Sequence, residues 1–173
     1  MSTSFQDNIT FSGICTFANS MVLAANCVND ANVGVNAAID ADKLQHRHPL
    51  DTELIASASA VTAVTKLLHI SAVTGAVIGL KAVVMTAATG ADRTVTVDLQ
   101  RSTGGAAFAT VLTTAIILNN ASTARVAQNA VVNATLISLV AGDILQVVVT
   151  VAGSAGDQAK GLLISAVIDE NAT

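Results

Sequence analysis

The chain has 173 residues and a net charge of −4; 52% of its residues are hydrophobic and only 12% are charged. This length fits one ordinary domain that buries a core without a metal or a disulfide. Charged residues normally make up about a quarter of a domain in water, and the few Lys and Arg residues are scattered, so a cationic face for nucleic acid is not expected.

The N-terminal part differs in pattern from the rest. Ile9, Phe11 and Phe17 fall on one side of a period-two alternation, which predicts a strand. From 19 to 36 the sequence is rich in Asn and small residues, which favours an extended arm that lies on some other surface. We therefore expect Phe5, Ile9, Phe11 and Phe17 to contact a partner. No Lys or Arg precedes the first apolar run, so synthesis and assembly in a cytoplasm are expected.

Residues 36–53 are the charge-dense part of the chain, which favours a linker between the arm and the sandwich. A helical turn is expected at 43–45, and Pro49 discourages helix at the preceding residue. His46 and His48, spaced by two, are able to bind a transition metal together with nearby acids, but Arg47 between them would oppose a cation. The sequence favours His46, Arg47 and His48 as partner-contact residues and predicts no metal site.

From about residue 60, short β-branched segments alternate with Gly, Asp, Asn and Ser turns. The pattern predicts strands near 63–71, 76–87, 93–100, 106–112, 114–119, 124–132, 143–152 and 161–169. Within 131–140 a connection is favoured over a short helix, because Val, Thr and Ile are weak helix formers.

This strand count and spacing predict an all-β fold, a jelly-roll-like antiparallel β-sandwich with an extended N-terminal arm. We expect residues 1–53 to form the N-terminal strand, arm and short linker, and residues 54–173 to form the sandwich. In the last strand, Leu162, Ile164, Ala166 and Ile168 should be buried, while Asp169 should face outward.

Motifs for chemistry are missing from the sequence. There is no nucleophile elbow, no Ser-x-x-Lys and no phosphate-binding glycine loop, so neither catalysis nor a cofactor or small-molecule substrate is expected. The acid pairs 40/42, 51/53 and 169/170 are expected to be solvated. Cys15 and Cys27 favour reduced thiols, with a disulfide as the alternative. His69 is expected to be a structural histidine with a hydrogen-bond partner.

Apolar windows are interrupted in ways that argue against a membrane partner. The segment 67–89 contains His69, Gly75, Gly79 and Lys81. The chain also has no Trp or Tyr and only four Phe, so ring platforms for sugars or bases are not expected.

Three segments resemble head decoration, or cement, proteins of tailed bacteriophages that carry a jelly-roll domain. These are Thr94–Leu99 followed by Gly104-Gly105, the segment Leu139–Val147 with its Ala-Gly-Asp turn, and the closing strand Gly161–Glu170. The upstream segment Ala37–His46 also looks like one found in phage structural proteins.

The resemblance implies a homotrimer on the virion, at the capsid surface, whose partners are other copies and the major capsid protein. A role in a tail fibre, neck or host-adhesion module is the alternative, and the lack of Trp and Tyr argues against it. A metal-dependent hydrolase on the same scaffold would rest on His46 and His48 alone.

Overall fold

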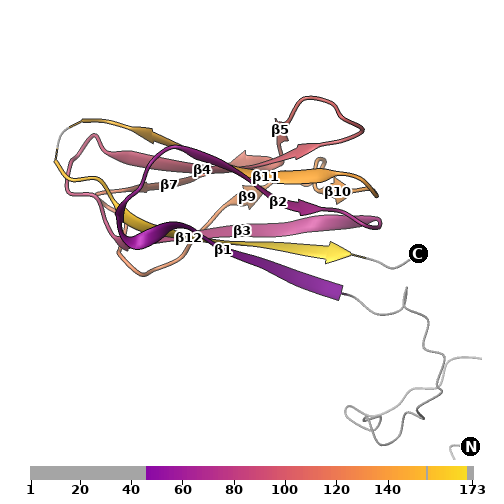
Figure 1. Cartoon of the computed structure of the whole chain (residues 1–173), viewed down its shortest axis with the longest axis horizontal. Helices are drawn as coiled ribbons and strands as arrows, with labels where there is room; N and C mark the ends of the chain where they lie inside the picture. Colours follow the sequence, from indigo (N-terminus) through magenta and orange to yellow (C-terminus); the bar gives the residue numbers. More distant parts are fainter. Residues whose placement is uncertain (1–45, 155, 171–173) are drawn as a thin grey trace, which may run out of the picture. The chain divides into compact units, whose positions relative to one another are not determined.

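The computed structural model describes residues 46–154 and 156–170 (Figure 1). The described residues form strands, turns and loops, and they contain no helix long and apolar enough to cross a membrane. The expected N-terminal arm, the expected turn at 43–45 and the candidates Phe5, Ile9, Phe11 and Phe17 lie outside this range.

Two sheets and a small third one make up the described fold, and all of the pairs between their strands are antiparallel. Sheet A contains, in order, β1 (His46–Ala60), β12 (Lys160–Glu170), β3 (Gly75–Thr86) and β10 (Ser138–Leu139), with β8 (Gln128–Asn129) also paired to β3. Sheet B contains β2 (Val64–Ile70), β11 (Ile144–Ala152), β4 (Thr94–Ser102) and β5 (Ala109–Thr110), with β7 (Ile116–Asn119) also paired to β4. The third sheet pairs β6 (Leu112–Thr114) with β9 (Val131–Val132).

The core lies between sheets A and B. Its central members alternate along their strands as the sequence predicts, and they include Val95, Val97, Leu99, Leu145, Val147, Val149, Leu162, Ile164, Ala166 and Ile168. Removing one such large apolar side chain from water contributes about 1.5–3 kcal/mol. The predicted all-β, jelly-roll-like antiparallel sandwich is confirmed.

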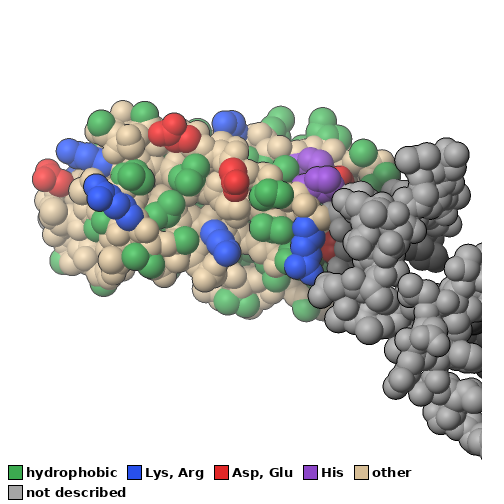
Figure 2. Space-filling view, turned by 90° about the horizontal axis from the view of Figure 1, so that it is seen from below, with side chains coloured by type: hydrophobic (Ala, Val, Ile, Leu, Met, Phe, Trp, Pro, Cys, Tyr) green, Lys and Arg blue, Asp and Glu red, His purple; other side chains and the backbone are tan. Residues whose placement is uncertain are grey.

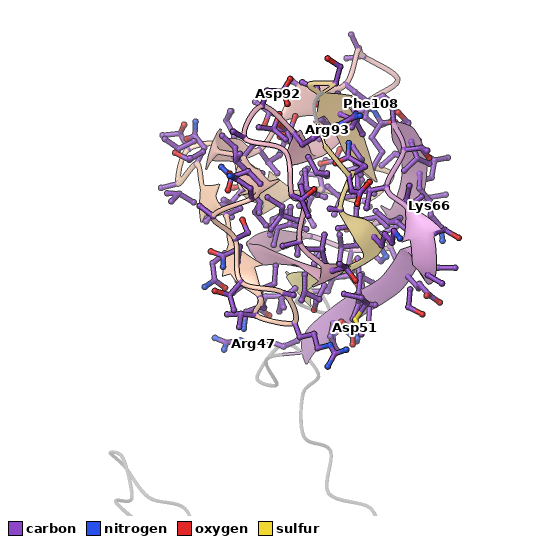
Figure 3. All side chains as sticks on the ribbon, turned by 90° about the vertical axis from the view of Figure 1, so that its left-hand side faces the viewer. Arg47, Asp51, Lys66, Asp92, Arg93 and Phe108 are labelled. Atoms are coloured by element: carbon purple, nitrogen blue, oxygen red, sulfur yellow. The ribbon has the colours of Figure 1, made fainter. Side chains whose placement is uncertain are left out.

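The two sides of the sandwich differ. On one side, β9 contacts β3 and β6 contacts β4, so the third sheet links sheet A to sheet B. On the other side, β1 and β2 are the edge strands of their sheets, and each pairs with a single strand among the described residues. Figure 3 shows Asp51 of β1 and Lys66 of β2 on this second side. One side of the described fold is therefore closed and the other presents two open edges.

Strand β1 is a correction to the sequence analysis, which assigned residues 46–53 to a linker. These residues pair with β12 in continuous register from His46–Glu170 to Glu53–Leu163. The pattern concealed the strand because an edge strand buries one narrow apolar stripe, here Leu50, Leu54 and Ile55. Charged residues and a proline are tolerated on such an edge.

Gly161 explains why β1 leaves its register beyond this point. The pairing shifts between Glu53 and Ile55 and again before Ala60, and residues 56–59 are exposed. Gly161 has a φ of 62°, and a Cβ there would lie 2.6 Å from the Cα of Ser57. The residue allows both the left-handed backbone and the close approach of the two chains.

Two other expectations hold only in part. Of the predicted strand 106–112 only the two-residue β5 and the first residue of β6 form, and of the predicted strand 124–132 only the two-residue strands β8 and β9. Arg125 has a φ of 62°, which interrupts extended backbone within the second range. The expected connection at 131–140 is confirmed, apart from β9 and β10: the amide of Leu136 bonds to the carbonyl of Asn133 at 2.9 Å in a turn.

Candidate functional site

The histidine-rich segment lies at the start of β1. Arg47 and His48 are exposed, and their partners in β12 are Asp169 and Ile168. Neighbouring residues of a strand point to opposite faces, so Arg47 and His48 do not converge on one ligand. Only the backbone of His46 is described. Whether the three residues contact a partner stays a prediction.

Within residues 46–154 and 156–170 there is no group of three or more His, Cys, Asp or Glu side chains able to hold a metal ion. The expected acidic helpers Asp51 and Glu53 are exposed on β1. They share a face with Arg47, which lies two and three alternating positions away, and a cation there would meet the guanidinium charge. The described part of the chain thus offers no donor set for a metal.

The most organised polar cluster lies where β2 and β12 approach each other at the end of the two sheets. Nε2 of His69 lies 2.9 Å from Oε1 of Glu170, and the hydroxyl of Ser71 lies 3.0 Å from the same oxygen. Ser71 also lies 2.8 Å from the carbonyl of Val73, to which it can donate. The expectation that His69 has a structural partner is confirmed.

This cluster lacks the geometry of a nucleophilic site. A serine nucleophile needs a base that accepts its proton, whereas here both Ser71 and His69 bond to the carboxylate of Glu170. Burial acts to raise the pKa of Glu170, but the bonds from His69 and Ser71 outweigh it and leave the pKa below its ordinary value. The arrangement holds an ionised carboxylate between the two sheets.

Two other acids are buried, and one of them, Asp169, corrects the expectation that the pair 169/170 is solvated. Asp169 is only 7% exposed, and its Oδ1 has no hydrogen-bond partner among the described residues. Asp143 is 1% exposed; its Oδ2 accepts the amide of Val140 at 3.1 Å and lies 3.8 Å from Nε of Arg101. Asp143 thereby fixes the turn before β11. The sequence predicted this turn but not the buried ion pair.

The outer face of sheet B carries polar side chains that bond to one another, beside exposed apolar ones such as Ile117. Gln146 donates to Gln100 at 3.0 Å, Gln100 donates to Asp98 at 2.9 Å, and the hydroxyl of Thr110 donates to Asp98 at 2.5 Å. This ladder crosses β11, β4 and β5. Leu67 on the neighbouring edge strand is exposed.

The outer face of sheet A also carries exposed apolar side chains, and its surface is uneven. Leu163, Ile78 and Met85 are 43%, 40% and 38% exposed on β12 and β3. Figure 2, which views the molecule from the side where β1 and β12 lie in Figure 1, shows isolated charged side chains among hydrophobic and neutral ones. Three shallow hollows lie between these side chains.

Comparison with known proteins assigns no family. Neither the protein-family models nor the curated proteins contain a match. Among solved structures, a chain of Desmodium yellow mottle tymovirus is similar, with a TM-score of 0.35 and 8% sequence identity. The match covers 98% of this chain and 96% of that one.

The partners Ser71 and Glu170 lie 99 residues apart and were not predicted from the sequence. Glu170 followed the last predicted strand and carried no signal of its own. A signal was present in His69, whose polar ring in an apolar strand requires a partner. Its identity depended on the pairing of two sheets and could not be read from the sequence.

Proposed function

We propose that this chain is a structural virion protein that decorates and cements the head of a tailed bacteriophage. The observation that carries the proposal is the small number of charged side chains in a chain whose described residues form a sandwich with exposed apolar side chains. The choice of a phage head as the particle rests on the sequence resemblance to phage decoration proteins. In this role the chain has no catalytic activity and needs no cofactor.

Covering a protein surface costs free energy when charged groups on it lose their water. Burying an unpaired charge costs several kcal/mol, so a surface that is repeatedly covered benefits from few charges. Leu163, Ile78 and Met85 on sheet A, and Leu67 and Ile70 on β2, remain substantially exposed. A neighbour that covers them gains apolar burial and displaces few charged groups.

Assembly on a shell multiplies weak contacts. We propose that the chain forms a homotrimer, that the trimer binds the major capsid protein at the capsid surface, and that it is assembled in the host cytoplasm. Three linked copies bind far more tightly than one when all of them reach the shell. The segment 1–45 and the residues His46, Arg47 and His48 are the proposed contacts with the shell.

The test uses undecorated heads of the phage that encodes this chain, together with the purified full-length chain. We expect the chain to sediment with the heads in saturable amounts and to raise the temperature at which the heads release DNA. A chain that ignores heads but binds host cells would instead support the fibre, neck or adhesion role. A chain that does neither contradicts both.

A further inference from the structure

Sheet A presents an outer face that is incomplete within one copy. Its outward side chains come from the three adjacent strands β1, β12 and β3. We call this surface the A face; its exposed and half-buried residues are Arg47, Pro49, Asp51, Glu53, Ile78, Lys81, Val83, Met85, Leu163, Ser165 and Val167. Apolar side chains make up most of this set, and its two basic residues are Arg47 and Lys81.

Asp51 and Lys81 occupy one row across the A face. Ser165 on the middle strand pairs with Asp51 on one side and with Lys81 on the other. The two charges are therefore two strand spacings apart, roughly 9–10 Å, which is too far for an ion pair. Both are exposed, and neither has an ion-pair partner among the described residues.

The relief of the A face suits a second sheet. Leu163 stands between two hollows: Lys81, Val83 and Ser165 help to line the first, and Glu53 and Met85 help to line the second. A projecting leucine at this position offers apolar area to a second sheet. Sheets pack face to face at about 10 Å in this manner, with their strands within roughly 30° of alignment.

We propose that the A face is covered by the A face of a second copy of this chain, about a twofold axis that runs parallel to β12. This rotation lays β12 on β12 and exchanges the flanking strands, so that β1 of each copy faces β3 of the other. Asp51 of each copy then meets Lys81 of the second copy, and the pair forms twice. Leu163 meets its counterpart on the axis.

The size of the face fixes the expected strength. Three strands with their flanking side chains span roughly 20 Å by 25 Å, so the contact buries about 1,000 Å² in total, at the lower limit of specific interfaces. Self-association in the micromolar range is therefore expected. The contact goes beyond the proposed function, because a twofold link between copies joins separate trimers and holds whether or not the particle is a phage head.

The test is a reciprocal charge exchange in the full-length chain, followed by sedimentation equilibrium. Asp51→Lys places two lysines opposite each other, and Lys81→Asp places two aspartates opposite each other. We expect each single variant to weaken self-association by at least about tenfold, because like charges then face each other twice. The combined variant D51K/K81D restores opposite charges and should recover the wild-type association.

Lys66→Asp is the matched control, because it makes the same charge change at an exposed position of β2 outside the A face. It should associate as the wild type does. The proposal is overturned if all variants have the same association constant, if Lys66→Asp weakens association equally, or if the combined variant fails to recover. Thermal melting of each variant separates loss of folding from loss of contact. Head binding by Asp51→Lys separates this contact from the proposed function: unchanged binding per copy leaves that function standing.

Discussion

The outer faces of the two sheets handle their polar groups in opposite ways. On sheet B, Gln146, Gln100 and Asp98 bond to one another across strands. On sheet A, Asp51 and Lys81 flank Ser165 without reaching each other. The first face satisfies its polar groups within one chain, whereas the second leaves an acid and a base for a partner. Solvent exposure alone would not distinguish the two faces.

The largest expected effect lies beneath both faces. Leu99→Ala removes a side chain that is 0% exposed between the sheets and should lower the free energy of unfolding by about 2–5 kcal/mol. Chemical denaturation measures the change. A loss below about 1 kcal/mol would mean that the sandwich core is loosely packed, and the comparison of its faces would lose its basis.

A smaller effect is expected on the sheet B ladder. Asp98→Ala removes the acceptor of two side-chain hydrogen bonds, from Gln100 and Thr110, and should cost about 1–2 kcal/mol of unfolding free energy. Denaturation of the isolated chain reads this cost directly. An unchanged stability would show that water replaces these hydrogen bonds without a cost in free energy. The polar groups of sheet B would then be no better satisfied within the chain than those of sheet A.

The matching change on the A face should barely affect folding. Asp51→Ala removes an exposed carboxylate that has no ion-pair partner among the described residues, so the unfolding free energy should change by less than about 0.5 kcal/mol. Self-association should nevertheless weaken. A large loss of stability in a chain kept monomeric by dilution would assign Asp51 to the fold and not to a contact.

The smallest effect concerns pH and the cluster that joins the two sheets. Burial acts to raise the pKa of Glu170 in the folded chain, but the hydrogen bonds from His69 and Ser71 outweigh it. The pKa is therefore below its ordinary value. The stabilising contribution of Glu170 is thus complete above the ordinary carboxyl pKa and is lost as the pH falls through the lowered value. Glu170→Gln should reduce the fall in melting temperature that accompanies this drop in pH. The same fall in the variant would show that Glu170 is not its source.

Much of the architecture could be predicted from the sequence, because apolar and polar residues alternate strictly in the central strands. Val95, Val97 and Leu99 face the core as period two requires. Edge strand β1 was missed because Arg47, Asp51 and neighbouring polar residues interrupt its narrow apolar stripe. The prediction of strand 124–132 was wrong in part, because the positive φ of Arg125 interrupts the extended backbone there.

The candidate surfaces were less legible than the fold. Composition indicated a covered exterior but could not say which face. The row formed by Asp51, Ser165 and Lys81 depends on the order of β1, β12 and β3, whose members are far apart in the chain. The bond between His69 and Glu170 spans 101 residues for the same reason. Such neighbours follow from sheet topology, which local patterns do not determine.

The central claim is that the bland exterior of this sandwich is made to be covered by further copies and by a particle. Sedimentation velocity of the full-length chain, from low to high micromolar concentration, tests it most directly. The account predicts trimers that grow into larger species as concentration rises. A single monomeric species over the whole range would contradict it.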